Sequence, residues 1–344
     1  MTHINDLQAT ITALATRGKG ILAADESTAT ISKRFQAIDI DCTDDSRRAY
    51  REMLMTAPEF NQFIAGVILF EETLNQKTSQ GLSFPDMLKN MGVLPGIKVD
   101  KGLVHLANTD NENITQGLDG LPERLAEYKS KGAAFAKWRA VYAISDNTPS
   151  RLAVKTNAEV LARYAAICQE QGIVPIVEPE VLIDGEHTLA RCEAVTEPVL
   201  HAVFNALYRH KVKLEYIVLK PSMVISGKAC PQKASVEEVA EATLRVLSRT
   251  VPAAVPTINF LSGGQTPEQA TAHLNLMNQH TLPWNLSYSY ARALQDYAMK
   301  TWAGKAEHLS AAQASLHKRA KLNSLAAKGE YSVSMEKEEI SRVA

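Results

Sequence analysis

Three observations predict an α/β fold built on a parallel sheet. Short apolar runs rich in β-branched residues recur along the chain, segments with helix patterns separate them, and no change of composition divides the chain. Such runs suit strands that are buried on both faces, as in a parallel sheet. The 344 residues, of which 45% are hydrophobic, are enough to bury one large core or two medium ones.

Eight apolar runs are expected to form the strands: Gly20–Ala24, Ile64–Phe70, Gly96–Val99, Ala133–Ala136, Ile173–Val177, Tyr216–Leu219, Val255–Leu261 and Trp284–Tyr290. Their alternation with helical segments predicts a single (β/α)8 barrel, or TIM barrel, over residues 1–328. An open doubly wound sheet is the alternative, but no GxGxxG pattern follows the first run. Residues 329–344 are polar and aperiodic, so we expect a flexible C-terminal tail there.

The helical segments carry residues that typically begin and end helices. Pro122 near the start and Gly132 at the end predict a helix over Leu121–Lys131. An apolar stripe predicts another helix over Leu152–Gln171, which Gly172 ends.

Two capping boxes mark further helix starts, because a hydroxyl and the side chain three residues later bind amide groups left free by the first turn. They are Ser235 with Glu238, and Thr266 with Gln269 beside Pro267. The stretch His187–His210 is also expected to be helical, and Pro198 is expected to kink or divide it.

Composition excludes several classes of function. The 37 basic and 38 acidic residues nearly cancel, so we expect neither a nucleic-acid surface nor a membrane surface. No apolar run approaches the roughly 20 residues of a membrane helix, and the polar N-terminal segment resembles no signal peptide. The four scattered cysteines favour reduced thiols, and a cytoplasmic protein is expected.

Polar and charged residues follow the predicted strands. In chain order they are Asp25, Lys101, Lys137, Arg139, Glu178, Glu180, Lys220, Ser262, Gly263, Gly264, Ser289 and Arg292. A single charge at such a position can simply mark where a strand meets water. In a (β/α)8 barrel, however, all these positions converge on one mouth, where the active sites of this fold lie. The set is also chemically coherent, with several cations, a few carboxylates and a glycine-rich turn.

The cations indicate a phosphorylated substrate. Lys101, Arg139 and Arg292 can neutralise phosphate oxygens, and arginine can do so with paired N–H groups. The turn Ser262–Gly264 exposes backbone N–H groups without obstruction by a Cβ atom. Such a turn alone can be a plain loop, but after the seventh strand of a barrel it favours a phosphate site.

Two lysines indicate amine chemistry. At strand ends inside a closed barrel, Lys137 and Lys220 would lie near apolar walls and near another cation, so lowered pKa values are expected for both. A neutral amine can attack a ketone, and the resulting iminium draws electrons from an adjacent C–C bond. Glu178 is placed to shuttle protons, and Asp25 to take the proton of the hydroxyl whose carbon becomes an aldehyde. Without this context, a strand-end lysine would more often be an ion-pair partner.

Six motifs in the same order resemble the class I fructose-bisphosphate aldolases: GILAADEST, VDKG, FAKWR, IVPIVEPE, VLKPSMV and NFLSGGQ. The resemblance runs from about Lys19 to about Leu325. It implies a lyase that reversibly cleaves fructose 1,6-bisphosphate to dihydroxyacetone phosphate and glyceraldehyde 3-phosphate, in glycolysis and gluconeogenesis. It also implies a homotetramer that uses a lysine Schiff base and needs no metal or other cofactor.

The resemblance assigns a role to each matching position. Lys220 corresponds to the Schiff-base lysine, Glu178 to the general acid/base with Glu180 as its neighbour, Lys137 to the residue that assists carbinolamine formation, and Asp25 to the residue that acts in C–C cleavage. The positions that match the holders of one phosphate are Ser262, Gly263, Gly264, Ser289 and Arg292. Those that match contacts to the other end of the substrate are Ser27, Arg34, Lys101 and Arg139.

The chain departs from the animal members of this family at a few positions. It has Ala29 and Ala291 where they have glycine, and Ser222 where they have asparagine. If position 291 requires a positive φ, alanine there would be strained. The animal enzymes also end in a tyrosine, whereas this chain ends in Ser341–Ala344, and Tyr331 is too far from the end to be taken as its substitute.

Three other functions compete with this one. A transaldolase or deoxyribose-phosphate aldolase would keep the Schiff base, but cations at two ends of the site favour a substrate with two phosphates. A metal-dependent aldolase is disfavoured because the nine histidines contain no HxxxH pair and do not cluster at strand ends. A catalytically silent barrel that acts as a binding scaffold would have lost some of the strand-end groups, and all four of the expected catalytic residues are present.

Overall fold

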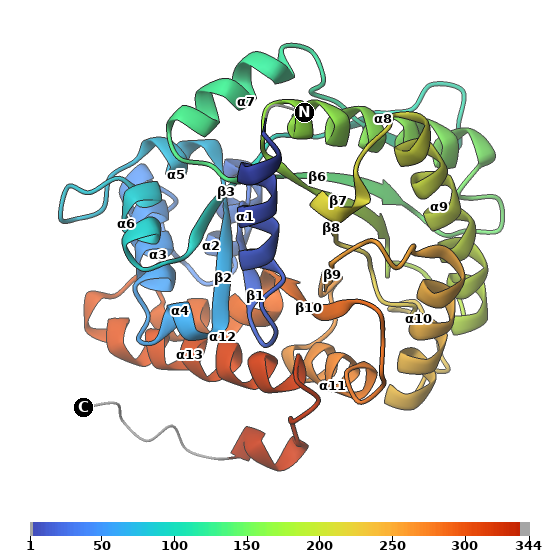
Figure 1. Cartoon of the computed structure of the whole chain (residues 1–344). Helices are drawn as coiled ribbons and strands as arrows, with labels where there is room; N and C mark the ends of the chain where they lie inside the picture. Colours follow the sequence, from blue (N-terminus) through green and yellow to red (C-terminus); the bar gives the residue numbers. More distant parts are fainter. Residues whose placement is uncertain (1–2, 338–344) are drawn as a thin grey trace.

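The computed structural model describes residues 3–337 and forms a closed barrel of eight parallel strands (Figure 1). Around the barrel the order is β1, β10, β9, β8, β7, β6, β3 and β2, and β1 pairs with both β2 and β10. The barrel strands are β1 Gly20–Ala24, β2 Ile64–Leu69, β3 Leu94–Lys98, β6 Phe135–Tyr142, β7 Val174–Val181, β8 Val218–Leu219, β9 Thr257–Phe260 and β10 Asn285–Tyr290. The predicted TIM barrel is confirmed, and the open doubly wound sheet is excluded.

The apolar runs locate all eight strands, but they end β6 and β7 too early. β6 includes Lys137 and Arg139, and β7 includes Glu178 and Glu180, although these residues were expected to follow the strands. They belong to the strands because β6 and β7 stay paired in parallel from Phe135 to Tyr142, well past the apolar run. Charged side chains therefore project from inside the sheet.

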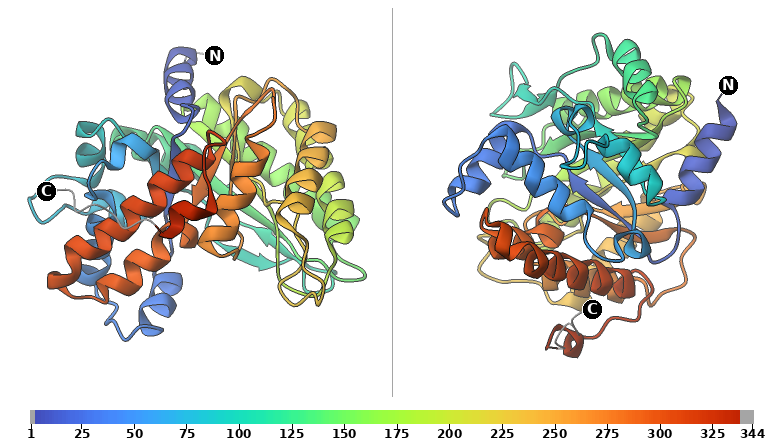
Figure 2. Two further views of the ribbon diagram at one scale, coloured as in Figure 1. Left: turned by 90° about the horizontal axis from the view of Figure 1, so that it is seen from below. Right: turned by 90° about the vertical axis from the view of Figure 1, so that its left-hand side faces the viewer.

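The amino-terminal part of the barrel interior is apolar. Side chains from several strands form one buried cluster with helix α1, Ile4–Leu14. Its members include Leu7, Ile11, Leu14, Ile21, Ala23, Ile68, Phe135, Val174, Ile176 and Val218. Helix α1 contacts β2, β3 and β7 and lies across the end of the barrel where the strands begin (Figure 2). Apolar side chains therefore fill the barrel interior at this end.

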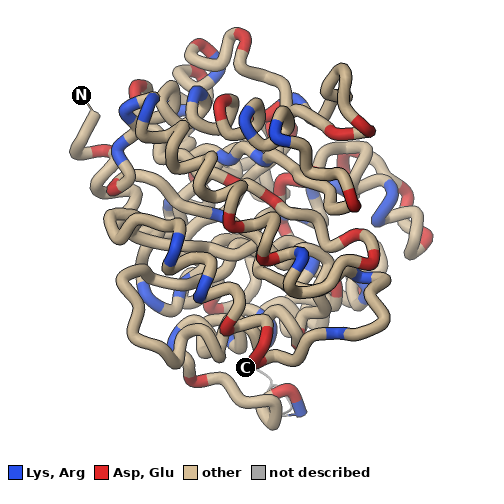
Figure 3. Tube along the Cα trace, turned by 90° about the vertical axis from the view of Figure 1, so that its right-hand side faces the viewer, with Lys and Arg blue, Asp and Glu red and all other residues tan. Residues whose placement is uncertain are grey.

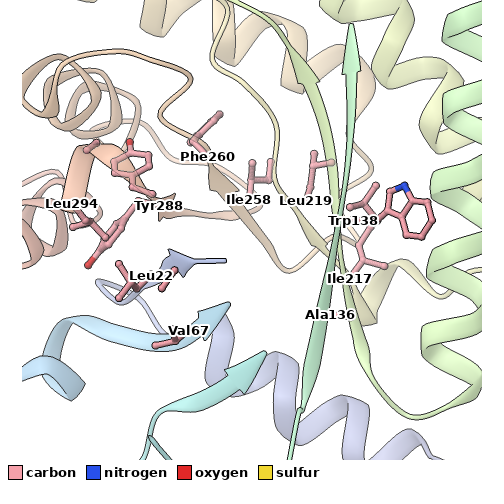
Figure 4. Packing of buried hydrophobic residues seen from close by; sticks show 14 of the residues in the cluster. Leu22, Val67, Ala136, Trp138, Ile217, Leu219, Ile258, Phe260, Tyr288 and Leu294 are labelled. Carbon is pink, nitrogen blue, oxygen red and sulfur yellow. The ribbon is translucent and has the colours of Figure 1, made fainter. Parts of the chain in front are cut away.

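Alternate residues of the same strands face outward and pack against the surrounding helices. Leu22, Val67, Trp138, Leu219 and Ile258 belong to this larger cluster (Figure 4). The α-helices after α1 are α2 Thr28–Gln36, α3 Asp44–Met55, α4 Phe60–Phe63, α5 Glu71–Asn75, α6 Phe84–Asn90, α7 Leu121–Ser130, α8 Arg151–Glu170, α9 Leu189–Arg209, α10 Val236–Thr250, α11 Pro267–Met277, α12 Arg292–Trp302 and α13 Leu309–Ala326. Three short 3-10 helices are η1 Leu214–Tyr216, η2 Ala306–His308 and η3 Val333–Lys337.

The predicted helix signals are confirmed with one exception. Both capping boxes form, at the starts of α10 and α11. Gly132 and Gly172 end α7 and α8 with φ values of 107° and 69°, which residues with a Cβ rarely adopt. The exception is α9, which continues through Pro198 as one helix, so the expected division there does not occur.

A hairpin interrupts the strand-and-helix alternation between β3 and α7. It consists of β4 Leu103–His105 and β5 Asn113–Thr115, paired antiparallel. Each strand is only three residues long, too short for a periodic pattern, so the sequence did not indicate it.

The first part of the expected C-terminal tail is docked on the barrel. Tyr331 is buried, its N–H donates to Asn275 Oδ1 at 2.9 Å, and its hydroxyl donates to Glu336 Oε1 at 3.0 Å. Arg319 of α13 donates to the same Glu336 carboxylate at 2.6 Å. These contacts hold the chain as far as η3. Residues 338–344 of the expected tail lie outside the described residues.

Gly96→Ala is expected to destabilise the barrel by about 1–3 kcal/mol, as overpacked cores do. A Cβ atom at position 96 would lie 2.2 Å from Cε2 of Phe135, whose ring is fully buried in the barrel interior. Urea unfolding measures the change. If the ring is the cause, Gly96→Ala combined with Phe135→Leu should lose less stability than the sum of the two single variants. Additive losses would contradict this explanation.

Candidate active site

The strand alternation places a charged residue above the apolar interior of several strands. Residues two apart in a strand face the same side of the sheet. In β7, Val174 and Ile176 face the apolar interior, so Glu178 projects into the barrel one step closer to the mouth. Lys220 stands in the same relation to Val218 at the end of β8. The corresponding pairs at β1 and β6 are Ala23 with Asp25 and Phe135 with Lys137.

These side chains meet in one buried charge cluster. Lys137 Nζ lies 2.7 Å from Asp25 Oδ2, 3.5 Å from Glu178 Oε2 and 4.0 Å from Asp100 Oδ2. The other oxygen of Glu178, Oε1, lies 3.1 Å from Lys220 Nζ. Every one of these residues is less than a tenth exposed. The structure thus brings together the four predicted catalytic residues, with Glu178 as the bridge between the two lysines.

The pKa of Lys137 is raised, so the expectation of a lowered value is wrong. Burial alone would lower it, but the attraction of Asp25, Glu178 and Asp100 outweighs burial. The pKa of Asp25 is lowered, because Lys137 and Lys220 outweigh a burial effect that would raise it. Lys137 is therefore a fixed ammonium ion at neutral pH and not a neutral amine. The strand-end pattern indicated another cation near Lys137, but it did not indicate how many carboxylates the barrel places around Lys137.

Asp100 and Lys98 belong to the site, and the sequence analysis missed both. Lys98 Nζ donates to Asp100 Oδ1 at 2.6 Å, and both residues lie at the end of β3. The signal was present, because Asp100 directly precedes Lys101 in the VDKG motif. A lysine inside an apolar run and an aspartate beside a more obvious cation are easily taken for the edge of the strand.

A cavity of about 510 Å³ opens beside the charge cluster. It is lined by Asp25, Glu26, Ser27, Thr30, Phe70, Glu71, Lys98, Val99, Asp100, Lys101, Gly102, Leu103, Arg124, Tyr128, Lys137 and Arg139. This volume is in the range of small-molecule sites. Its walls are rich in cations and carboxylates, so it suits a polar, charged ligand.

Three residues that the resemblance assigned to one end of the substrate line this cavity. Ser27 caps α2, since its Oγ accepts from the Thr30 N–H. Lys101 is about half exposed, and its Nζ lies 3.9 Å from Glu71 Oε2. Arg139 donates from Nε to Glu180, so the predicted neighbour of Glu178 holds this guanidinium in place.

Arg34, the fourth of these residues, does not line the cavity. Its Nη1 donates to Gln295 Oε1 at 2.7 Å and also to Glu26, and its Nη2 donates to Asp296 Oδ1 at 3.1 Å. These contacts tie α2 to α12. Burial raises the pKa of Glu26 even though Arg34 and Arg51 oppose this. Glu26 was not singled out from the sequence, although it directly follows Asp25 and lines the cavity.

The residues predicted to hold the other phosphate lie around the turn after β9. Gly263 and Gly264 have φ values of 55° and 88°, in the left-handed region that favours glycine. A Cβ atom at Gly264 would lie 3.5 Å from Arg292 Nη2, which places the guanidinium beside the turn. Ser262 and Ser289 are buried, and Ser289 Oγ makes no hydrogen bond within residues 3–337. The turn, the guanidinium and free polar atoms together can surround an anion.

The departures from the animal pattern do not distort the site. Ala291 has φ of −100°, so the position does not need a positive φ and the particular strain expected from one is absent. Ala29 lies inside α2. Ser222 exchanges two hydrogen bonds of 2.9 Å with the backbone of Val181 and thereby joins the segment after Lys220 to the end of β7.

The surface and the remaining polar residues offer little for other functions. Basic and acidic residues are mixed along the trace, and no large area of one sign stands out in Figure 3. Within residues 3–337, no cluster of three or more His, Cys, Asp or Glu side chains could hold a metal ion. In the same range, no helix has both the length and the apolar character that a bilayer crossing requires. All four cysteines are free thiols.

A closed barrel that buries two lysines joined by one glutamate at its carboxyl end defines a TIM-barrel enzyme equipped for carbonyl chemistry. The family described as fructose-bisphosphate aldolase class-I matches residues 6–343. The chain belongs to this family and is a carbon–carbon lyase.

Individual relatives agree with this assignment over nearly the whole chain. A Xanthomonas campestris protein named probable fructose-bisphosphate aldolase class 1 is 53% identical over 95% of this chain and 99% of its own length. The Arabidopsis thaliana protein named fructose-bisphosphate aldolase 6, cytosolic, is 55% identical over 95% of this chain and 92% of its own. A solved structure of the Plasmodium falciparum aldolase, in complex with TRAP and an inhibitor, superposes with a TM-score of 0.94 at 48% identity and covers 95% of both chains.

Lys137→Met is expected to destabilise the protein by about 3–5 kcal/mol near pH 7.5, because three buried carboxylates would lose a shared cation. The folded-state pKa of Lys137 is raised, so its stabilisation is present at every pH below its ordinary value of about 10.4. The loss should shrink near pH 5.5, since carboxylates without that cation can take up protons. Urea unfolding at both pH values measures this.

Lys131→Met is the matched control for this charge removal. Lys131 pairs with Glu127 at 2.6 Å on the surface of α7, where both side chains are well exposed. Its replacement should cost less than about 1 kcal/mol at either pH. Equal losses for the two lysine variants would refute the idea that the carboxylate cluster depends on Lys137.

Proposed function

We propose that this chain cleaves fructose 1,6-bisphosphate reversibly through a Schiff base on Lys220. The observation that carries the proposal is the contact of 3.1 Å between Lys220 Nζ and Glu178 Oε1, both nearly inaccessible to bulk water. A primary amine with a carboxylate at this distance has a partner for each proton that Schiff-base formation moves. We assign the nucleophile to Lys220 rather than to Lys137, because Lys137 forms ion pairs with Asp25, Asp100 and Glu178.

Schiff-base formation requires proton transfers that Glu178 can carry out. Lys220 passes a proton to Glu178, its nitrogen attacks the ketone carbon, and a second amine proton moves to the former carbonyl oxygen, which gives a neutral carbinolamine. Glu178 then donates a proton to the carbinolamine hydroxyl, water leaves, and the iminium forms. Glu178 Oε2 accepts no hydrogen bond within residues 3–337 and lies 3.5 Å from Lys137 Nζ, so it has the capacity to hold this proton. The Lys137 ammonium assists by polarising the oxygen that is being protonated.

C–C cleavage requires a base at the hydroxyl of the carbon two positions from the iminium carbon. Asp25 has a lowered pKa and stays a carboxylate, so it can take the proton of the hydroxyl on the carbon that becomes the aldehyde. The electrons of the C–C bond then move into the iminium, which becomes an enamine. Asp25 lies 2.7 Å from Lys137 Nζ, and this contact fixes the position of the base.

Two anion-binding regions match a substrate with a phosphate at each end. One phosphate is assigned to Ser262, Gly263, Gly264, Ser289 and Arg292. The other end is assigned to Ser27, Lys101, Arg139 and Arg34. For Arg34 this requires an exchange of at least one of its present contacts, with Glu26, Gln295 or Asp296. Cations on both sides of the Schiff-base lysine favour a sugar bisphosphate over the monophosphates of transaldolase or deoxyribose-phosphate aldolase chemistry.

The iminium supplies the electron sink, so the proposed mechanism needs no metal or other cofactor.

The proposed assembly and cellular setting rest on the family resemblance. A homotetramer that acts in the cytoplasm, in glycolysis and gluconeogenesis, is proposed because the family resemblance implies it and because one relative is named a cytosolic enzyme.

Borohydride trapping tests the Schiff base directly. Reduction in the presence of fructose 1,6-bisphosphate and excess EDTA should leave a covalent adduct on Lys220 and inactivate the enzyme, because an iminium is reduced to a stable secondary amine. Mass spectrometry of peptides locates the adduct. Lys220→Arg keeps the positive charge but offers no nucleophilic amine, so it should show neither adduct nor turnover. An adduct found on Lys137 or Lys98 would disprove the assignment.

Glu178→Gln is expected to lower kcat by about 10²–10⁴-fold while KM changes little, because the amide keeps the shape but cannot transfer protons. Steady-state cleavage of fructose 1,6-bisphosphate measures both constants. Glu241→Gln, on the exposed side of α10, is the control and should leave both unchanged. A Glu178→Gln enzyme with normal kcat would remove Glu178 from the proton-transfer steps.

A further inference from the structure

The side chain of Gln265 forms a hydrogen bond within the turn that follows β9. Ser262 and Gln265 close the turn, since the Gln265 N–H donates to the Ser262 carbonyl at 3.0 Å. The side-chain Nε2 of Gln265 donates to the same carbonyl at 3.1 Å. One carbonyl oxygen thus accepts two hydrogen bonds from one residue, and both of its lone pairs are engaged.

The Gln265 amide is itself fixed by buried neighbours from other elements. Its Oε1 lies 2.6 Å from Nδ1 of His273, which is in α11, and its Nε2 lies 3.6 Å from Met223 Sδ. Gln265 is 7% exposed and His273 is 3% exposed. The amide therefore cannot turn without losing these buried contacts.

The hydrogen-bond directions in this chain are determined by elimination. A carbonyl only accepts, so the Gln265 atom that faces Ser262 must be the NH₂ group and its oxygen must face His273. His273 must then donate from Nδ1. Burial lowers the pKa of His273 to about 4, although Glu237 opposes this. At neutral pH the ring is therefore neutral and carries its proton on Nδ1.

Fixing the Ser262 carbonyl also fixes the neighbouring N–H group. In a trans peptide unit the C=O and the following N–H point in opposite directions. Since the Ser262 oxygen is directed at Gln265, the Gly263 N–H points away from Gln265. Gly263 has φ of 55° and no side chain, so the hydrogen bonds to the Ser262 carbonyl act directly on the orientation of this peptide plane.

We propose that His273 and Gln265 are positioning residues for phosphate binding, and that they act by aiming the Gly263 N–H at the substrate phosphate. The chain of contacts runs from His273 to Gln265 to the Ser262 carbonyl and ends at the Gly263 N–H, beside Arg292. Without the His273 proton, the Gln265 amide is free to flip, and its oxygen would then repel the Ser262 carbonyl. This inference rests on the proposed function, because it assigns the turn to a substrate phosphate.

Three variants test the chain of contacts. His273→Leu removes the hydrogen-bond donor at similar side-chain volume. It should raise the KM for fructose 1,6-bisphosphate about tenfold and change kcat by less than about threefold, because one buried hydrogen bond that orders a binding group is lost. Gln265→Leu should have the same effect. His273→Asn should restore a nearly normal KM, because its Nδ2–H₂ group occupies almost the position of the histidine Nδ1–H.

His317→Leu is the matched control for loss of a buried histidine. His317 in α13 is 8% exposed, and its Nε2 lies 2.8 Å from Glu59 Oε2, where it can reach neither the turn nor the charge cluster. This variant should lose thermal stability to a similar degree without a change in KM. If its KM rises as much as that of His273→Leu, the effect is a general loss of packing and the proposal is wrong.

Calorimetric titration with inorganic phosphate separates this inference from the proposed function. Phosphate binding needs no turnover, so it can be measured even if the wild-type protein does not cleave the sugar bisphosphate. Such a failure of cleavage would overturn the proposed function and would leave the phosphate measurement as the test of the positioning role. His273→Leu should weaken phosphate binding by about the same tenfold factor as KM, and His273→Asn should not. Equal affinity in wild type and His273→Leu, or no phosphate binding by the wild type, would overturn the positioning role.

Discussion

The architecture of the site depends on the burial of one ammonium group. Lys137 is almost inaccessible to water, and an uncompensated charge in such a place would cost several kcal/mol. Compensation comes from Asp25 after β1, Asp100 after β3 and Glu178 in β7. Asp100 follows β3 and Glu178 lies in β7, the two strands that flank β6, whereas Asp25 follows β1, which is not a neighbour of β6, and reaches Lys137 across the barrel interior. The parallel register and the curvature of the sheet therefore assemble the charges that neutralise Lys137.

A simple rule divides the interior into an apolar part and a charged part. Every second residue of a strand points into the barrel. Where the inward residues change from apolar to charged along the strand, the barrel interior changes from apolar to charged at the same height. Phe135 fills the apolar part so closely that Gly66 and Gly96 leave no space for a Cβ atom beside its ring. Helix α1 seals that end. The charge cluster lies next to these buried apolar side chains, where the effective dielectric constant is low. Each charge in the cluster therefore acts strongly on its neighbours.

The sequence predicted the barrel and most of the site, and its errors in the charge cluster share one physical cause. The apolar runs located every strand because burial on both faces selects the same residue types locally. They failed at Lys137, Arg139, Glu178 and Glu180, since a charged residue inside a strand is tolerated only if a partner from another strand compensates it. The pKa of Lys137 was wrongly predicted for the same reason, and Asp100 was overlooked. Properties that depend on long-range partners are not contained in a local pattern, whereas the motif order was sufficient to identify the family.

The charge balance of the cluster also bears on why Schiff-base chemistry suits this barrel. Three lysines, Lys98, Lys137 and Lys220, face three acidic residues, Asp25, Asp100 and Glu178. In the proposed mechanism, an iminium on Lys220 would carry a positive charge at nearly the position of the lysine nitrogen, so its attraction to Glu178 would survive the covalent step. The neutral amine, the carbinolamine and the enamine lack that charge, and in the carbinolamine Glu178 can balance the cluster by holding a proton of its own. The environment that stabilises the resting lysine therefore also stabilises the iminium, and the barrel need not rearrange between them.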